Sequence, residues 1–139
     1  MKILFLCHGN INRSAAGEII VKQKYPQHEV KSAGLKTKDG KITAKKMREA
    51  LNESGYSTEG IRSSVCTQEL IDWADVVYYM DNGNETRLRE QFGDVEHSVR
   101  LSSYLPGIDK IPDPHFHTGN EMHKKVIVMI EKALENAGL

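Results

Sequence analysis

Short apolar runs mark the candidate strands of this chain. Continuous runs at residues 3–6 and 76–80 are typical of strands buried on both faces, as in a parallel sheet. Weaker runs at residues 29–33 and 99–101 predict two further strands. The chain is therefore expected to contain four strands, spread over its first hundred residues.

Between and after these runs, apolar residues recur with the spacing of amphipathic helices. Pro26 is expected to stop the first helix, Gly55 to end the second, and Asn84 to cap the fourth. Residues 105–118 hold three of the four prolines and predict an irregular loop. The predicted helices cover residues 14–24, 44–54, 67–73, 84–92 and 120–137.

Strands that alternate with helices indicate an α/β fold in which helices cover both faces of a parallel sheet, an α/β/α arrangement of three layers. The 139 residues are about the length of one ordinary domain. The chain contains no internal repeat, low-complexity tract or long linker, so residues 1–139 are expected to form a single domain.

Composition and charge exclude several classes of protein. The chain is 39% hydrophobic and 27% charged, as in soluble globular proteins, and its formal net charge is zero. No global field therefore attracts it to nucleic acid or to an anionic membrane. The apolar run at residues 3–6 is too short for a signal peptide or a membrane span. The only cysteines, Cys7 and Cys66, lack zinc-site spacing, which favours free thiols and a cytoplasmic location.

The segment richest in chemistry joins the first predicted strand to the first helix. In open α/β sheets, ligands bind beyond the carboxyl ends of the strands. Backbone N–H groups of such a loop, together with a helix N-terminus, form a nest that suits a dianionic phosphate. The segment reads Cys7-His8-Gly9-Asn10-Ile11-Asn12-Arg13-Ser14.

Each side chain in this loop has a candidate task. A helix N-terminus and a nearby arginine stabilise a thiolate, so Cys7 is the candidate nucleophile. Arg13 offers a planar fork that matches two phosphate oxygens, and Ser14 is placed to donate a hydrogen bond to the sulfur. We expect Gly9 to adopt a positive φ, and Asn10 to tolerate left-handed geometry and to tie the loop together. A lone cysteine would more often be a core residue; the residues that follow Cys7 favour catalysis.

A candidate acid lies late in the chain. Asp113 stands between Pro112 and Pro114, in a stiff loop that precedes the last helix. An Asp-Pro pair alone is typical of a turn. With the Cys7 loop in the same chain, we interpret Asp113 as the general acid for a leaving oxygen.

These motifs resemble those of the low-molecular-weight protein tyrosine phosphatases. The loop from Cys7 to Ser14 is similar to the family's C-x-G-N-I-C-R-S, residues 32–34 to its Ser-Ala-Gly, residues 74–81 to its A-D-x-I-x-x-M-D, and residues 113–114 to its Asp-Pro. The resemblance implies a four-stranded parallel sheet with no metal or other cofactor. It also implies that Cys7 takes the phosphoryl group and that Asp113 then activates water.

On this resemblance, the substrate is a phosphorylated protein, with phosphotyrosine the leading choice, and inorganic phosphate is a product. Ile11 is apolar, as in tyrosine-directed members. Lys36, Lys38 and Lys41 form either a solvated charged loop or a basic rim for an acidic substrate. The expected substrate-contacting residues are His8, Gly9, Asn10, Ile11, Asn12, Ser14, His115 and Phe116.

Asn12 departs from the family pattern, because it occupies the place of a second loop cysteine. In the family, that cysteine can form a disulfide with the nucleophile and so shield it from over-oxidation. Our hypothesis is that this protein lacks the protection. Cys66 is expected to be a core residue, and it could take over this protection only if it lay close to Cys7.

Three alternatives stay open at the level of the sequence. Arsenate reduction uses a similar thiolate loop but needs partner thiols, and only Cys66 is available. A non-catalytic phosphoprotein-binding module would have no use for Asp113. His115, His117 and His123 give only weak evidence for a metal site, since no third ligand is clear.

Overall fold

A computed structural model describes all 139 residues, and its centre is one parallel sheet of four strands in the order β2-β1-β3-β4. The strands are β1 (Lys2–Cys7), β2 (Glu29–Gly34), β3 (Val76–Tyr79) and β4 (Ser98–Arg100). The helices are α1 (Arg13–Lys24), α2 (Lys45–Glu53), α3 (Gln68–Trp73), α4 (Asn82–Phe92) and α5 (Glu121–Asn136). Two short 3₁₀ turns, η1 (Leu101–Tyr104) and η2 (Pro114–Phe116), flank the loop before α5.

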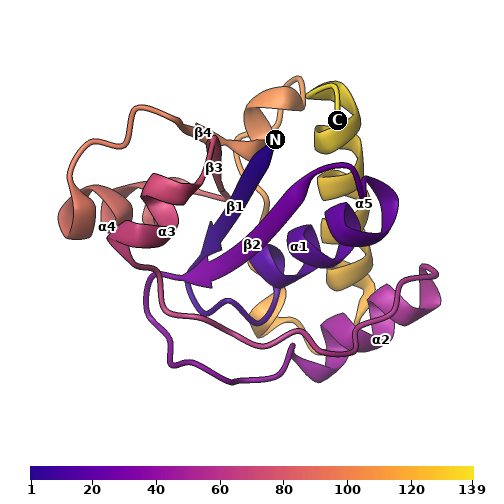
Figure 1. Ribbon diagram of the computed structural model, residues 1–139. Coiled ribbons are helices and arrows are strands. Elements are labelled where there is room, and N and C mark those ends of the chain that lie inside the picture. Colours follow the sequence, from indigo (N-terminus) through magenta and orange to yellow (C-terminus); the bar gives the residue numbers. More distant parts are fainter.

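The central strand β1 separates two hydrophobic cores. Side chains alternate across a strand, and Ile3, Phe5 and Cys7 enter the core built with α1, α2 and α5. Leu4 and Leu6 enter the smaller core on the other face, which includes residues of α3 and α4. Figure 1 shows the sheet between these two groups of helices. The predicted α/β/α class and the four-stranded parallel sheet are confirmed.

Helix α1 packs tightly on β1 at Gly17. A Cβ atom at this position would lie 2.7 Å from the ring of Phe5, which is closer than real Cβ contacts come. Glycine therefore lets the helix approach the strand. This close packing fixes the span that the loop between β1 and α1 has to cross.

Two predictions about the elements were wrong in detail. Helix α4 is capped by Asp81, whose carboxylate accepts a hydrogen bond from the backbone N–H of Asn84 at 2.8 Å. Asn84, the predicted cap, is buried in the first turn, and its side-chain oxygen accepts from the N–H of Met80. Strand β4 is short, and Leu101 begins the turn η1 and does not continue the strand.

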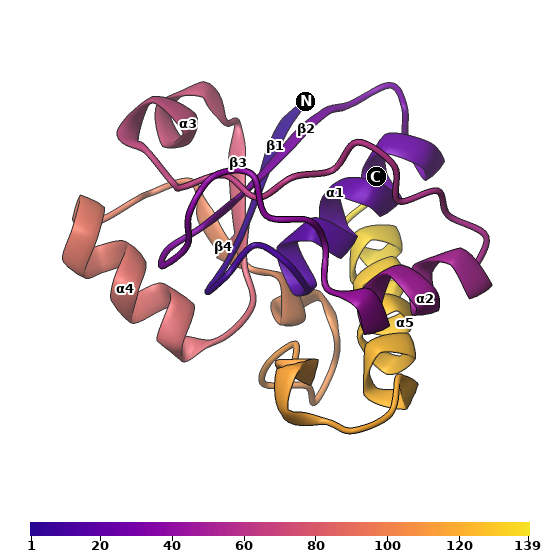
Figure 2. The ribbon, with the colours of Figure 1, turned by 90° about the horizontal axis from the view of Figure 1, so that it is seen from below.

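All four strands run parallel, so their carboxyl ends meet at one edge of the sheet. Figure 2 is viewed from below Figure 1, toward this edge. The loop before α5 reaches the same edge, because the N–H of Ile111 donates to the carbonyl of Met80 at 3.0 Å. The loop after β1, the start of α4 and the Asp113 loop therefore come together there.

None of the helices combines the length and the hydrophobicity that crossing a lipid bilayer requires.

Candidate active site

A cavity of about 550 Å³ opens at the carboxyl edge of the sheet. Its walls come from the loop after β1, the segment after β2, the start of α4 and the loop before α5. The structure thus brings Asp113 together with Cys7 and Arg13, although it is far from them in sequence. The other predicted site residues that line it are His8, Gly9, Ile11, Asn12, His115 and Phe116.

Asn10 and Ser14 lie behind the cavity and are buried. Asn10 is the only non-glycine residue with positive φ, at 57°, so the prediction of left-handed geometry is confirmed there. Gly9 does not have the positive φ that we expected. Asn10 performs the turn because its amide makes hydrogen bonds that repay the unusual backbone angle.

The Asn10 amide has one possible orientation. Its Oδ1 accepts a hydrogen bond from the backbone N–H of Ser64 at 2.8 Å, so the nitrogen must point the other way. Its Nδ2 group donates to Ser14 Oγ at 2.8 Å and to Ser32 Oγ at 2.9 Å. Both serine oxygens are therefore acceptors toward Asn10, and each must direct its own proton elsewhere.

Those two protons go to opposite ends of the network. Ser14 Oγ lies 2.9 Å from the sulfur of Cys7, and Ser32 donates to the carboxylate of Glu18. Because Ser14 already accepts from Asn10, its hydroxyl donates to Cys7, as predicted. Hydrogen bonds to an anion are stronger than those to a neutral group, so the network favours Cys7 as a thiolate.

Arg13 is 2% exposed and held from behind by two partners. One guanidinium nitrogen donates to Asp81 at 2.7 Å and to the carbonyl of Ile111 at 2.9 Å. The other terminal nitrogen makes no hydrogen bond within the chain and lies 3.8 Å from a carboxylate oxygen of Asp113. One side of the fork is therefore anchored, while the other is available to an oxyanion in the cavity.

Asp81 was missed as a site residue by sequence reasoning. Burial by itself would raise its pKa, but hydrogen bonds from Arg13 and from the N–H of Asn84 outweigh this, and the pKa lies below the usual value. Asp81 is thus a fixed anion beside Arg13. Its position directly after the strand at residues 76–80, at the edge where the strands end, was the signal that could have identified it.

Asp113 lies at the mouth of the cavity, with 39% of its side chain exposed. Its Oδ1 accepts from the backbone N–H of His115 at 3.0 Å and so caps the turn η2. Oδ2 faces Arg13. The carboxyl group is therefore oriented by the loop that carries it and still reaches solvent, as an acid and base that exchanges protons must.

His115 and Phe116, two of the residues expected to contact the substrate, form the aromatic part of the mouth. Their rings meet edge to face, with centroids 4.9 Å apart. Phe116 is 88% exposed, so it forms a lip at the entrance and not a buried wall. Only three of the fifteen lining residues are hydrophobic, and the cavity is polar overall.

Basic side chains complete the lining. Lys36 and Lys41 come from the segment after β2, and Arg87 comes from α4. The pKa of His8 lies below its usual value, first because of burial and then because of the charges of Arg87 and Lys36. Of the two readings of this segment, a solvated charged loop or a basic rim, the position of Lys36 and Lys41 in the cavity lining fits the basic rim. Arg87 was not predicted.

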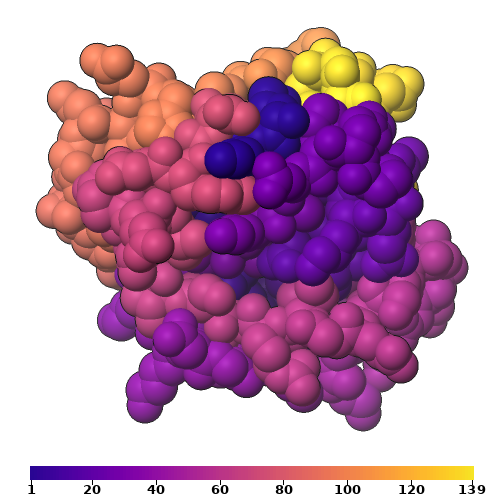
Figure 3. All heavy atoms as spheres, viewed as in Figure 1, coloured from indigo at the N-terminus to yellow at the C-terminus, as the bar shows by residue number.

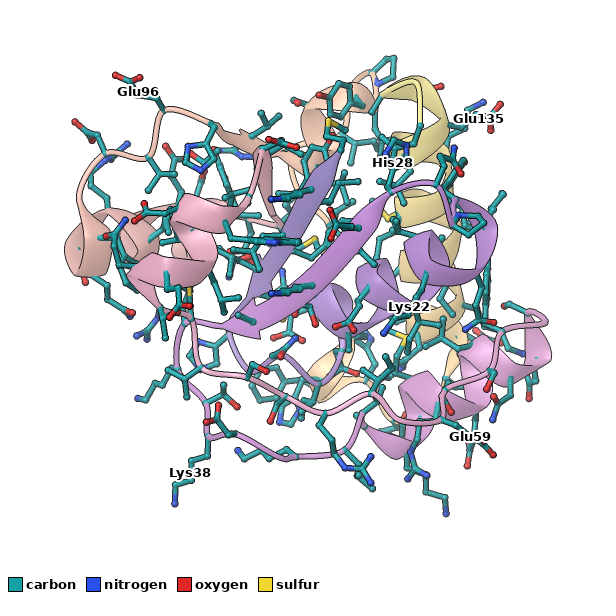
Figure 4. All side chains as sticks on the ribbon, in the orientation of Figure 1. Lys22, His28, Lys38, Glu59, Glu96 and Glu135 are labelled. Atoms are coloured by element: carbon teal, nitrogen blue, oxygen red, sulfur yellow. The ribbon has the colours of Figure 1, made fainter.

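Lys38 does not line the cavity. Figure 4 shows Lys38 projecting away from the body of the molecule. In Figure 3 the segment that carries it protrudes at the lower left, on the side of the molecule where the strands end.

The two thiols lie in different cores. Cys7 belongs to the core with α1 and α5, and Cys66 to the core on the opposite face of the sheet. Burial raises the pKa of Cys66 to about 12, so this thiol is unreactive at neutral pH. Asn12 is buried next to Arg13, and its side-chain oxygen has no hydrogen-bond partner in the chain.

The histidines after Asp113 do not form a cluster of metal ligands. His115 and His117 are exposed, whereas His123 is buried in α5. No group of three or more histidine, cysteine or acidic side chains is arranged to hold a metal ion.

Comparison with known proteins places this geometry in a family. The model of the low molecular weight phosphotyrosine protein phosphatases matches residues 2–137. A protein-arginine-phosphatase from Geobacillus stearothermophilus is 34% identical over 116 residues, which cover 81% of this chain and 78% of that protein. A low molecular weight protein-tyrosine-phosphatase from Staphylococcus epidermidis is 25% identical over 95% of this chain and 96% of its own length.

Solved structures agree with the sequence comparison. An arginine phosphatase from Geobacillus stearothermophilus superposes with a TM-score of 0.87 at 30% identity, covering 98% of this chain and 89% of that one. The fold and the loop at Cys7 define a cysteine-dependent phosphatase. The chain belongs to the low molecular weight protein tyrosine phosphatase family.

Proposed function

We propose that residues 1–139 act as one cytoplasmic phosphatase domain that removes phosphate from proteins through a phosphocysteine on Cys7. The observation that carries this proposal is the convergence of three groups on one cavity. Cys7 accepts a hydrogen bond from Ser14, Arg13 presents a free guanidinium nitrogen, and Asp113 stands 3.8 Å from that nitrogen.

In the first step, the Cys7 thiolate attacks phosphorus and the bond to the leaving oxygen breaks. Asp113 gives its proton to that oxygen, and the phosphoryl group stays on sulfur. Arg13 and the backbone N–H groups of the loop balance the charge on the phosphoryl oxygens. In the second step, Asp113 takes a proton from water, the water oxygen bonds to phosphorus, and Cys7 leaves as a thiolate while inorganic phosphate is released.

Phosphotyrosine is the proposed substrate residue. Ile11, Phe116 and the ring of His115 supply the few apolar surfaces of the cavity, and a phenyl ring can pack against them. We place the phenolic oxygen toward Asp113 at the mouth.

Phosphoarginine is a second candidate, favoured by the printed names of the 34% identical relative and of the solved structure. Electrostatics argue against it, since a guanidinium is best held by carboxylates. The cavity's only carboxylates, Asp81 and Asp113, already face Arg13, and the rest of its charged lining is cationic.

The cations at the mouth support a substrate with acidic residues near the phosphosite. Lys36 and Lys41 line the cavity, and neither side chain has a carboxylate partner within the chain.

Arsenate reduction is disfavoured, because Cys66 lies across the sheet from Cys7 and cannot relay a disulfide.

Parallel assays of peptides carrying phosphotyrosine, phosphoserine or phosphoarginine test the substrate class. We expect phosphate release from the phosphotyrosine peptide to have the highest kcat/KM, and a Cys7→Ser variant to be inactive on all of them. A preference for phosphoarginine would replace the substrate proposal. Equal rates for Cys7→Ser and the parent would overturn the mechanism.

A further inference from the structure

The mouth of the cavity holds cations that no carboxylate of the chain neutralises. Lys36, Lys41 and Arg87 line it, and their side chains take part in no ion pair and no hydrogen bond within the chain. Nearby arginines behave differently. Arg89 lies 3.2 Å from Glu85 and 3.5 Å from Asp94, and Arg100 also contacts Glu85 at 3.1 Å.

This unpaired charge is a local feature. The chain has 19 basic and 19 acidic residues and no net charge, so a general excess of cations cannot account for it. The two carboxylates within the cavity, Asp81 and Asp113, are both turned toward Arg13. Apart from these two carboxylates, the charged lining outside the phosphate-binding loop is only positive.

Two of these cations approach His8 from different elements. The backbone N–H of Lys36 donates to the carbonyl of His8 at 2.9 Å, which fixes the segment after β2 beside the loop. Arg87 comes from α4, on the side of the cavity that also carries Asp81 and Gly83. Their charges both lower the pKa of His8, after the effect of burial, whereas the charge of Asp113 raises it.

Arg87 is half-buried, whereas Lys36 is exposed. A half-buried guanidinium has already lost part of its hydration, and its planar fork matches a carboxylate. Arg87 is thus better suited than a solvated lysine to bind one defined anion next to the phosphate.

We propose that Arg87, with Lys36 and His8, forms a second anion subsite that binds a carboxylate side chain next to the phosphorylated residue of the substrate. This proposal rests on the proposed function and adds to it a preference for an acidic residue beside the phosphorylated residue. The carboxylate is held equally in the ground state and in the transition state, because it lies away from the reacting phosphorus. Its contribution therefore falls mainly on KM.

The test compares phosphotyrosine peptides that differ at one flanking position. One peptide has glutamine on both sides of the phosphotyrosine, a second has glutamate on the N-terminal side, and a third has glutamate on the C-terminal side. We expect kcat/KM of the parent enzyme to be about threefold to tenfold higher for one glutamate peptide than for the glutamine peptide. The preference should shrink as salt is raised.

Arg87→Gln should bring this ratio close to one, and Lys36→Gln should lower it partly. Arg89→Gln and Lys38→Gln are the matched controls, since both residues lie on the same segments but outside the cavity, and they should keep the ratio of the parent. Equal kcat/KM for all three peptides, or an unchanged ratio in Arg87→Gln, would overturn the subsite while leaving the phosphatase proposal intact. Failure of the parent to hydrolyse even the glutamine peptide would instead count against the proposed function.

Discussion

The hydroxyl of Ser14 can donate in only one direction. Asn10 donates to it from one side at 2.8 Å, and Asn10 is itself fixed by the N–H of Ser64. The proton of Ser14 is therefore committed to Cys7 before any substrate arrives. A donor that is already oriented costs no reorganisation when the thiolate forms or leaves.

Replacing Ser14 with alanine removes this donor while leaving Arg13 and Asp113 in place. Hydrogen bonds to charged groups contribute about 1.5–3 kcal/mol, so we expect kcat to fall by about tenfold or more. Alkylation of Cys7 by iodoacetate, measured against pH, should require more alkaline conditions than in the parent. Ser14→Cys keeps a weak donor, so its kcat should lie between those of the parent and of Ser14→Ala. An unchanged alkylation profile in Ser14→Ala would show that Ser14 does not stabilise the thiolate.

The sequence predicted the site residues that lie together in one short segment of the chain. Cys7, Asn10, Arg13 and Ser14 lie within eight positions, and local chemistry was enough to assign their tasks. The contact of Asp81 with Arg13 and the place of Arg87 in the cavity lining could not be predicted from neighbouring residues, because they depend on the order of the strands in the sheet and on which side of α4 faces the cavity.

The contact between α1 and β1 sets the geometry of the elements around the loop. Gly17 is the point of closest approach, against the ring of the fully buried Phe5. A longer distance between helix and strand would stretch the loop that carries Cys7 and Arg13.

Gly17→Ala should destabilise the protein although alanine favours helices. Over-packing a core costs about 1–3 kcal/mol, whereas the gain in helix propensity is about 1 kcal/mol, so we expect a net loss in the free energy of unfolding. Urea titration followed by circular dichroism measures it. Gly119→Ala is the control, because its Cβ would meet no atom within 4 Å. Equal stability of both variants would contradict the packing account.

His123, near the start of α5, makes the stability of the protein depend on pH. It is 2% exposed, and its Nδ1 atom has no hydrogen-bond partner. Its pKa lies below the usual 6.5, first because of burial and then because of the charges of Lys46 and His117, with Asp113 acting in the opposite direction. The folded state therefore prefers the neutral ring.

As the pH falls, His123 is protonated in the unfolded chain before it is protonated in the folded protein. Its contribution to the free energy of unfolding is therefore fully present above pH 6.5 and is lost as the pH falls below that value. We expect His123→Leu, which cannot titrate, to lose less stability than the parent between pH 7 and pH 5. Chemical denaturation at each pH gives the free energy of unfolding of both proteins as a function of pH. If this free energy fell equally with pH in the parent and in the variant, His123 would not be the cause of the loss.

The elements themselves were largely predictable, and their ends were not. Apolar runs and helical spacing identified the strands and helices, because burial of these side chains determines both. The cap of α4 was misassigned because Asp81 and Asn84 are both good capping residues, and only the buried hydrogen bond of Asn84 to Met80 distinguishes them.

Across the whole molecule, the sheet separates the two thiols. Cys7 and Cys66 lie in cores on opposite faces, and Asn12 occupies the position next to Arg13 where a second cysteine could have shielded the nucleophile. This arrangement leaves oxidised Cys7 without a resolving thiol in the chain.

Peroxide should therefore inactivate the enzyme without full recovery. In the absence of a partner thiol, the sulfenic acid proceeds to sulfinic acid, which dithiothreitol does not reduce. We expect activity to stay low after peroxide followed by dithiothreitol, in the parent and equally in Cys66→Ser. In Asn12→Cys, activity should return. Full recovery in the parent would show that the chain protects Cys7 by another route.

We infer that the phosphoryl group passes through Cys7, with Asp113 as acid and base. The most direct measurement is mass spectrometry of quenched reactions with para-nitrophenyl phosphate, whose leaving oxygen needs little help from an acid, using Asp113→Asn to slow hydrolysis of the intermediate. We expect one phosphoryl group on the peptide that contains Cys7, and none in a Cys7→Ala, Asp113→Asn double variant, which has no nucleophile at position 7. A phosphoryl group on another residue, or turnover by Cys7→Ser at the rate of the parent, would contradict this mechanism.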